Sequence, residues 1–384
     1  MRTKLAAALL ALTGSVIACA NAADSLSAGD SRENGSPGAA ADGADAGAAP
    51  SEALGPTDNG IILVHAAGAP AFRLCFQGDL ERLPLPDRQV MPQANVVGVE
   101  VGSAVRLAPL AVPPGEVYLF EEPLIRAFYP TFGGAGDGPT CQQLLSSGSI
   151  KPASLGRIDD DVSTGVHLLV VKGCIRQPVN GTFSPAECGA DYNPDDGNLG
   201  IEKITLRGFF REGGAVLPTQ VVQLSQALAT AAAGQTLAVT FGDVKTPQAQ
   251  LTDVIAEKDF AVFGDALPAT PVALPYDGTD DAVHASLGFR VELRPTDGGA
   301  VTRLDSQTLA EIQALSSPTD IPSRYYAAAS NYVLLLLGDP NAKPQGDAGP
   351  DEREKLHMVA VPVIEPKPED GGADLDGGPA PDGG

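Results

Sequence analysis

The chain has 384 residues, with 48 Asp and Glu against 25 Lys and Arg, and a formal net charge of −23 at pH 7. Its few basic residues are not clustered, so the composition argues against nucleic-acid binding and against electrostatic adsorption to anionic lipid. The length exceeds that of one ordinary domain, so we expect two.

The N-terminus has the features of an export signal. Arg2 and Lys4 form a cationic start, and Leu5 to Val16 is an apolar run too short to span a bilayer. The following Val16-Ile17-Ala18-Cys19 resembles the lipobox of bacterial lipoprotein signals. This resemblance implies that residues 1–18 are a signal peptide and that Cys19 becomes the lipidated first residue, with palmitate-type acyl chains as the membrane anchor.

The resemblance also carries an expectation about location. Ala20 follows Cys19 where an Asp would favour retention in the inner membrane. By similarity to Gram-negative sorting rules, we expect an outer-membrane lipoprotein that faces the periplasm or the cell surface.

Low-complexity segments flank the central body of the chain. Residues 19–59 and 365–384 are rich in Ala, Gly, Asp and Pro and have almost no large apolar side chain. Such segments bury too little surface to offset the entropy lost on ordering. We predict a disordered lipid-anchored tether and a disordered acidic tail around two domains, 60–190 and 198–364.

The body is predicted to be mainly β, with two antiparallel sandwich-like domains and a few short helices. Short β-branched or aromatic runs alternate with Gly and Pro turns, which is typical of antiparallel sandwiches. The predicted strands, in chain order, are Ile61–His65, Ala71–Phe76, Val96–Val101, Val105–Leu110, Val117–Glu121, Val166–Lys172, Ile201–Phe209, Val221–Leu224, Leu237–Phe241, Phe260–Phe263, Leu287–Leu293, Val333–Leu337 and Leu356–Val363.

Helices are predicted at three places. Thr308-Leu309-Ala310-Glu311 is a capping-box pattern, followed by apolar residues at helical spacing and by Pro318. Pro322 begins a second short piece, and Cys141 to Leu145 a third of one or two turns.

A weak internal echo suggests that the two domains arose by duplication. Val64-His65-Ala66-Ala67 followed by Phe72-Arg73-Leu74-Cys75 is similar to Val283-His284-Ala285-Ser286 followed by Phe289-Arg290-Val291-Glu292.

Four cysteines follow Cys19, and an even number in an exported chain indicates disulfides. Three pairings are possible for Cys75, Cys141, Cys174 and Cys188. Cys174 and Cys188 enclose a short turn-rich loop, so we favour this pair together with Cys75–Cys141. Zinc binding is the alternative, and the lack of a C-x-x-C pair argues against it.

Several stretches resemble an uncharacterised family of Gram-negative surface lipoproteins with V-H-A-type extracellular β-sandwich domains of unknown function. They are Leu63 to Phe76, Cys188 to Tyr192 with Gly197 to Gly200, Ser306 to Pro318, Tyr332 to Pro340 and Leu356 to Pro362. The resemblance covers most of residues 60–363, and it implies a fold but no catalytic residue.

One acidic segment resembles a calcium loop. Asp191, Asn193, Asp195 and Glu202 stand at positions 1, 3, 5 and 12, which is EF-hand spacing. However, Gly197 stands at position 7 rather than 6, and no amphipathic helix flanks the segment. A turn in which Asx side chains cap their own backbone is the alternative that we favour.

The sequence contains no recognisable catalytic motif, so we predict a protein that is not an enzyme. G-x-S-x-G, H-E-x-x-H and P-loop patterns are absent. The four histidines each lie in or beside a predicted strand, and we interpret them as satisfied sheet residues; they are His65, His167, His284 and His357. Tyr325-Tyr326 and Phe209-Phe210 are the nearest candidates for an aromatic platform for sugars.

These features favour a non-catalytic surface or periplasmic protein that binds an unknown protein or glycan. A calcium-dependent carbohydrate- or polymer-binding module and a hydrolase with an unrecognised site are the alternatives. The expected partner, besides the unknown protein or glycan, is the membrane, through the N-terminal lipid. Nucleic acid is not expected as a partner. No cofactor is expected apart from calcium in the second hypothesis.

Overall fold

The computed structural model describes residues 58–86, 98–107, 110, 112–129, 138–176, 185–209, 215–246, 249–257, 260, 263–264, 266–278, 281–318, 320–326, 331–342 and 353–364. All of them belong to one compact unit, Ala48–Gly384. Among these residues, no helix has both the length and the apolar character needed to cross a membrane. The predicted signal, Cys19, the tether and the acidic tail lie outside the described residues, apart from the last two residues of the tether.

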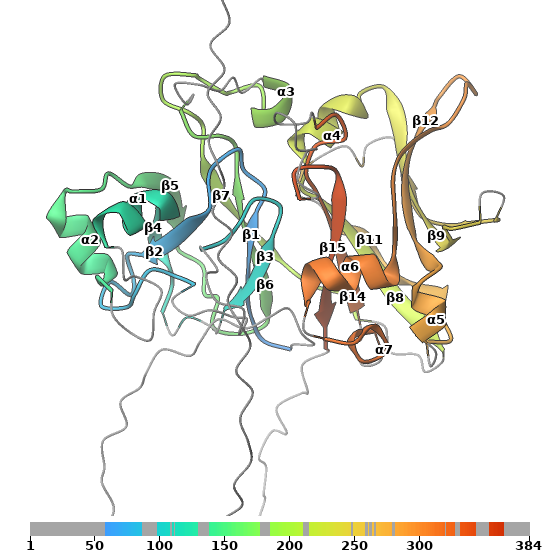
Figure 1. The fold of residues 1–384 in the computed structure, drawn as a ribbon, viewed down its shortest axis with the longest axis horizontal. Helices are drawn as coiled ribbons and strands as arrows, with labels where there is room; N and C mark the ends of the chain where they lie inside the picture. Colours follow the sequence, from blue (N-terminus) through green and yellow to red (C-terminus); the bar gives the residue numbers. More distant parts are fainter. Residues whose placement is uncertain are drawn as a thin grey trace, which may run out of the picture. The chain divides into compact units, whose positions relative to one another are not determined.

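The first half of the described chain contains seven strands and three short helices (Figure 1). In chain order these are β1 (Gly60–His65), β2 (Phe72–Phe76), β3 (Ala104–Leu107), β4 (Gly115–Glu121), α1 (Glu122–Phe128), α2 (Cys141–Ser147), β5 (Ala153–Ile158), β6 (Val166–Lys172), α3 (Pro185–Cys188) and β7 (Gly200–Thr205).

The second half contains eight strands and four helices. These are β8 (Val216–Gln223), α4 (Gln226–Ala231), β9 (Gln235–Asp243), β10 (Thr252–Glu257), β11 (Ala266–Pro275), α5 (Asp281–His284), β12 (Leu287–Pro295), β13 (Thr302–Thr308), α6 (Leu309–Ser316), α7 (Pro322–Tyr325), β14 (Asn331–Leu337) and β15 (His357–Val363).

The predicted mainly β class is confirmed, because the strands form four mainly antiparallel sheets. The first inner sheet has the order β3-β1-β6-β7 and the first outer sheet β2-β4-β5. In the second half, the second inner sheet is β11-β8-β14-β15 and the second outer sheet is β10-β9-β12-β13. Among the strand pairs of the described residues, two are parallel, β1 with β6 and β8 with β14, and each lies at the centre of an inner sheet.

The two halves repeat one strand order. In each inner sheet, the first strand of the half pairs in parallel with a late strand, and one antiparallel strand flanks each of the two. The residues of the sequence echo do not correspond in this repeat, because Val283 and His284 lie in helix α5 whereas Val64 and His65 lie in β1. The topology therefore repeats, but the proposed residue match was wrong.

Three apolar layers hold the sheets together. One joins the first outer and first inner sheets, and another joins the second inner and second outer sheets. The middle layer is formed by side chains from both inner sheets, including Ile62 and Leu168 from the first half and Leu335 and Val361 from the second. Figure 1 shows the inner sheets side by side.

The middle layer explains why the inner strands are apolar at consecutive positions. A strand with one solvated face alternates apolar and polar residues, whereas a strand that is buried on both faces is continuously apolar. All residues of β1, β14 and β15 are buried, and so are the first six of β6. In β14, Leu334 and Leu336 pack toward the outer sheet while Val333 and Leu335 pack into the middle layer.

Polar contacts also join the two halves. His357 of β15 places Nε2 2.7 Å from the carbonyl oxygen of Gly102. Gly102 has φ +65°, and a Cβ there would lie 2.3 Å from the carbonyl oxygen of Arg353, so the close approach requires glycine. The Nζ of Lys172 lies 5.2 Å from the centre of the Phe263 ring.

Helix α6 begins where the sequence predicts. The Thr308 hydroxyl accepts a hydrogen bond from the Glu311 amide, and the Glu311 carboxylate accepts one from the Thr308 amide. The same reciprocal cap occurs between Thr140 and Gln143 at α2, where the prediction was a helical piece without a capping box.

Some strands differ from the predictions. β5, β10, β11 and β13 were not predicted, and Val99 makes an isolated bridge with Phe72 where a strand was expected. β7 was assigned to the predicted domain 198–364, but it is hydrogen-bonded to β6 of the first half. The division of the body into two domains stays a prediction.

The middle layer gives a direct test of the fold. Leu335 is fully buried there, so Leu335→Ala removes packed apolar volume, and we expect a loss of about 2–5 kcal/mol in the free energy of unfolding, measured by urea denaturation. Val301→Ala is the control, because Val301 is 53% exposed. A loss no larger than that of the control would contradict a packed middle layer.

Candidate functional site

The cysteines form the two pairs that the sequence favours. Cys75 on β2 is bonded to Cys141 at the start of α2, and Cys174 after β6 is bonded to Cys188 in α3. Asn198 holds the second loop together, because its side-chain oxygen accepts from the Cys174 amide and its Nδ2 donates to the Cys188 carbonyl. Both pairs are therefore structural elements of the first half.

The calcium-loop residues lie between α3 and β7. The Asn193 side-chain oxygen accepts from the Asp195 amide, and its Nδ2 donates to Asp196, which is the geometry of an Asx turn. Glu202 lies on β7, and its carboxylate is 2.5 Å from Nζ of Lys172. Within the described residues, no group of three or more His, Cys, Asp or Glu side chains is arranged to hold a metal ion. The calcium hypothesis for Asp191, Asn193, Asp195 and Glu202 stays a prediction.

Three of the four histidines lie on strands, as expected, and all four are buried. His65 is on β1, His167 on β6 and His357 at the start of β15, whereas His284 ends helix α5. The interpretation of His284 as a sheet residue was wrong, since the residues before β12 form a helical turn.

The two outer sheets differ in what lies on their outer faces. On the first outer sheet, Cys75 and Phe120 pack against Ile125 of α1 and Leu144 of α2, so helices cover this face. On the second outer sheet, Phe289, Val291 and Leu293 point into the apolar core. Because side chains alternate along a strand, Arg290, Glu292 and Arg294 lie on the opposite face. We call this face, formed by β10, β9, β12 and β13, the polar face.

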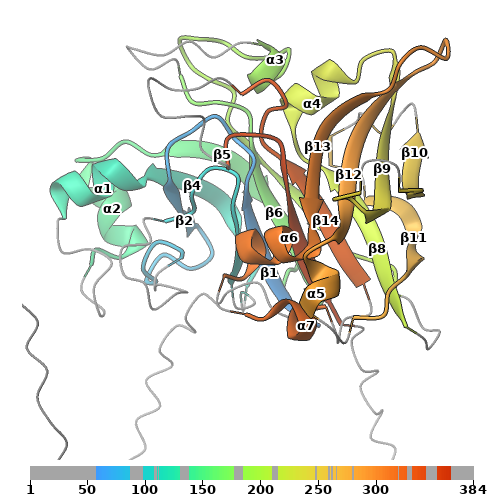
Figure 2. The same cartoon turned by 45° about the vertical axis from the view of Figure 1, so that its right-hand side comes forward.

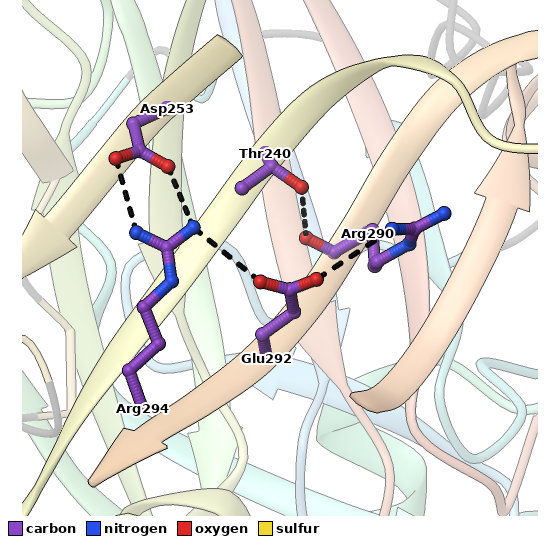
Figure 3. A network of polar contacts seen from close by, with 5 residues as sticks. All are labelled: Thr240, Asp253, Arg290, Glu292 and Arg294. Carbon is purple, nitrogen blue, oxygen red and sulfur yellow. Dashed lines mark hydrogen bonds and ion pairs between the residues drawn. The ribbon is translucent and has the colours of Figure 1, made fainter. Parts of the chain in front are cut away.

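The polar face carries a chain of ion pairs (Figure 3). Arg294 donates from Nη1 and Nη2 to both carboxylate oxygens of Asp253, at 3.0 and 2.7 Å. Its Nη2 also lies 3.3 Å from Glu292, which in turn lies 3.7 Å from Nη1 of Arg290. The hydrogen bonds that Arg294 donates to Asp253 raise the pKa of Arg294. Two guanidinium groups and two carboxylates therefore form one network with no net charge.

The sheet register places the residues of this network on adjacent, hydrogen-bonded strands. Asp253, Thr240, Arg290 and Ser306 lie opposite one another on the four strands. Thr240 is almost fully buried on this face, and its hydroxyl lies 3.5 Å from the Arg290 carbonyl oxygen. Figure 2 turns the second outer sheet toward the viewer, with its strands side by side. The polar face is thus a four-stranded surface with charges of both signs.

A second polar group lies inside the core of the second half. The Tyr276 hydroxyl is 2.5 Å from Nε2 of His284, and Nδ1 of His284 is 3.9 Å from Asp281. The order hydroxyl, imidazole and carboxylate resembles a catalytic triad. However, burial raises the pKa of Tyr276, which is the opposite of what an activated nucleophile needs. His284 stacks on Tyr326, so this cluster fixes α5 against the aromatic core.

Within the described residues, the structure does not place the two predicted aromatic pairs, Tyr325-Tyr326 and Phe209-Phe210, together as a sugar-binding platform on the surface. Tyr325 and Tyr326 are buried, and their hydroxyls donate to the carbonyls of Ala360 and Leu309. The interpretation of this pair as a surface platform was wrong, because the rings form part of the core. Phe209 is partly buried and packs against the middle layer, and Phe210 lies outside the described residues.

A buried ion pair anchors α1 to the first outer sheet. Nε of Arg73 is 2.5 Å from the Glu122 carboxylate, and Nε of Arg126 is 3.0 Å from the same group. The side chains of Arg73 and Glu122 are 3% and 0% exposed. These charges are compensated within the protein, so we regard the pair as structural.

The sequence contains one local signal for the polar face. Phe289-Arg290-Val291-Glu292-Leu293-Arg294 alternates strictly, which indicates a strand with one polar side. The ion pair with Asp253 joins residues 41 positions apart, so only the pairing of β10 with β9 and of β9 with β12 brings it about.

No family model, curated protein or solved structure was found to match the chain. The lipoprotein family that the sequence resembles therefore stays a prediction.

His65 provides a test of how burial controls charge. Burial lowers its pKa from 6.5 to about 4, so the folded state holds it neutral. The unfolded chain binds the proton more readily, so the stabilisation is fully present above pH 6.5 and is lost as the pH falls toward 4. A shift of this size corresponds to about 3 kcal/mol. We expect His65→Gln to flatten the pH dependence of the free energy of unfolding over this range.

The matched control is His167→Gln, the same substitution on the neighbouring strand β6. Urea denaturation at half-unit pH steps measures both variants. An unchanged slope in the His65 variant would show that this ring does not cause the acid sensitivity.

Proposed function

We propose that this protein is an exported lipoprotein that binds a partner without catalysing a reaction. The lipobox ending at Cys19 supports the export and the anchor. Two disulfides support the location, since such bonds persist in oxidising compartments outside the cytosol. We place the anchored protein on the outer membrane, facing the periplasm or the cell surface.

The observation that carries the binding role is the polar face. Strand-borne side chains are held in place by their neighbours, which suits recognition because little freedom is lost on binding. Arg294 and Asp253 fix one another bidentately, and Glu292 is only 14% exposed. The outer face of the first outer sheet is covered by helices, so the polar face is the better candidate for contact with a partner.

The two alternatives have less support. For a calcium-dependent module, Glu202 would have to leave Lys172 to complete the shell. For a hydrolase, the Tyr276–His284 pair lies in the core, and the raised pKa of Tyr276 disfavours it as a nucleophile. Binding at the polar face requires neither the separation of Glu202 from Lys172 nor an activated Tyr276.

The anchor is tested by Cys19→Ala. We expect the wild type to incorporate radiolabelled palmitate and to fractionate with membranes, because its first mature residue carries the acyl chains. The variant should lose the label and the membrane association. Equal labelling of the two proteins would exclude lipidation at Cys19.

The binding role is tested by photo-cross-linking in cell-envelope preparations. Arg303 is the exposed cross-strand neighbour of Glu292, and a photoreactive residue there should form discrete adducts. Excess protein without the photoreactive group should compete these adducts away. Arg157, which is exposed on β5 of the first outer sheet, is the control position. Adducts at position 157 but not at 303 would contradict the use of the polar face.

A further inference from the structure

Arg290 is an anomaly within the polar face. Its side chain is only 8% exposed, and Nη1 is 3.7 Å from Glu292, which is beyond hydrogen-bond distance. Among the described residues, Nε and Nη2 of Arg290 are buried and have no hydrogen-bond partner. Leaving charged donors unsatisfied in this way is costly, so native proteins rarely do it without a reason.

The two carboxylates of the network are already engaged by Arg294. Asp253 receives two hydrogen bonds from Arg294, and Glu292 receives another from the same guanidinium. The Thr240 hydroxyl is directed to the backbone carbonyl of Arg290. The described part of the polar face therefore leaves the Arg290 donors without an acceptor of their own.

The two unsatisfied nitrogen atoms lie on one edge of the guanidinium group. Nε–H and Nη2–H point in the same direction, because Nη2 is the terminal nitrogen on the side away from Cδ. Two parallel donors on a planar cation match the two oxygens of a carboxylate, and such bidentate pairs are among the strongest hydrogen bonds in proteins. Arg294 uses its other edge, Nη1 and Nη2, to bind Asp253 in a similar manner.

We propose that the Nε–Nη2 edge of Arg290 binds a carboxylate group of a ligand, and that Arg290 is the anchoring residue of the polar face. This inference rests on the proposed function, since it assigns a ligand chemistry to the same surface. Asp253, Glu292, Arg290 and Arg294 together carry no net charge, so a single added carboxylate leaves the network with a charge of only −1. A dianion such as phosphate would be repelled by Glu292, 3.7 Å from the same guanidinium.

Both nitrogen atoms are screened from solvent. A charge-assisted hydrogen bond is stronger in such a screened site than in water.

The test is an NMR titration of the arginine Nε–H signals in the purified mature protein, using sodium acetate and sodium chloride at equal ionic strength. Arg290 should give a saturable shift with acetate and none with chloride. The third titration uses sodium phosphate at the same ionic strength, and we expect phosphate to bind at least tenfold more weakly than acetate. Saturation by phosphate as tight as by acetate, or no saturable acetate shift at Arg290, would overturn the assignment.

Arg290→Lys keeps a positive charge but removes the planar edge, and we expect it to weaken acetate binding at least tenfold, measured by ligand-induced thermal stabilisation. The control is Arg157→Gln on the other outer sheet, which should bind acetate as the wild type does. If Arg290→Lys does not fold, the wild-type titration still decides the question. Loss of the acetate signal with retained cross-linking at position 303 would overturn the carboxylate site and leave the proposed function standing.

Discussion

The middle apolar layer is the constraint on which the rest of this structure depends. It requires both inner sheets to be apolar on two faces, which accounts for the burial of every residue in β1, β14 and β15 and of the first six residues of β6. A sheet with two apolar faces cannot remain exposed on either, so each inner sheet also needs an outer sheet. The four sheets and three apolar layers follow from this requirement.

The outer faces, which the layers do not constrain, are where the halves differ. In the first half, the Cys75–Cys141 bond and the Arg73–Glu122 ion pair fasten α2 and α1 over the first outer sheet. In the second half, the corresponding face carries Asp253, Glu292, Arg290 and Arg294. One repeated topology thus presents a covered, covalently fastened face and a charged one, and on the charged face Nε and Nη2 of Arg290 have no acceptor among the described residues.

The polar groups of the core serve a different purpose from those of the polar face. Tyr276, His284, Tyr325 and Tyr326 satisfy one another or nearby carbonyls, and burial raises the pKa values of the three tyrosines. They fix α5 and α7 against the sheet. At the polar face the pairing is incomplete, which is what distinguishes a candidate binding group from a structural one.

The sequence by itself determined the features that depend on neighbouring residues. The Thr308 capping box, the turn-rich loop between Cys174 and Cys188 and the apolar runs of the inner strands all act over a few positions.

Tertiary structure decided the features that depend on distant partners. β11 contains Pro268, Pro271 and Pro275 and becomes a strand only through its pairing with β8, while β5, β10 and β13 likewise lie at sheet edges. The unsatisfied edge of Arg290 also depends on distant partners. Alternation along β12 places Arg290 on the polar face, but only the pairing of β12 with β9 and of β9 with β10 brings Asp253 to Arg294 and not to Arg290. A short sequence pattern encodes which side a residue faces, whereas its partner depends on how the whole chain packs.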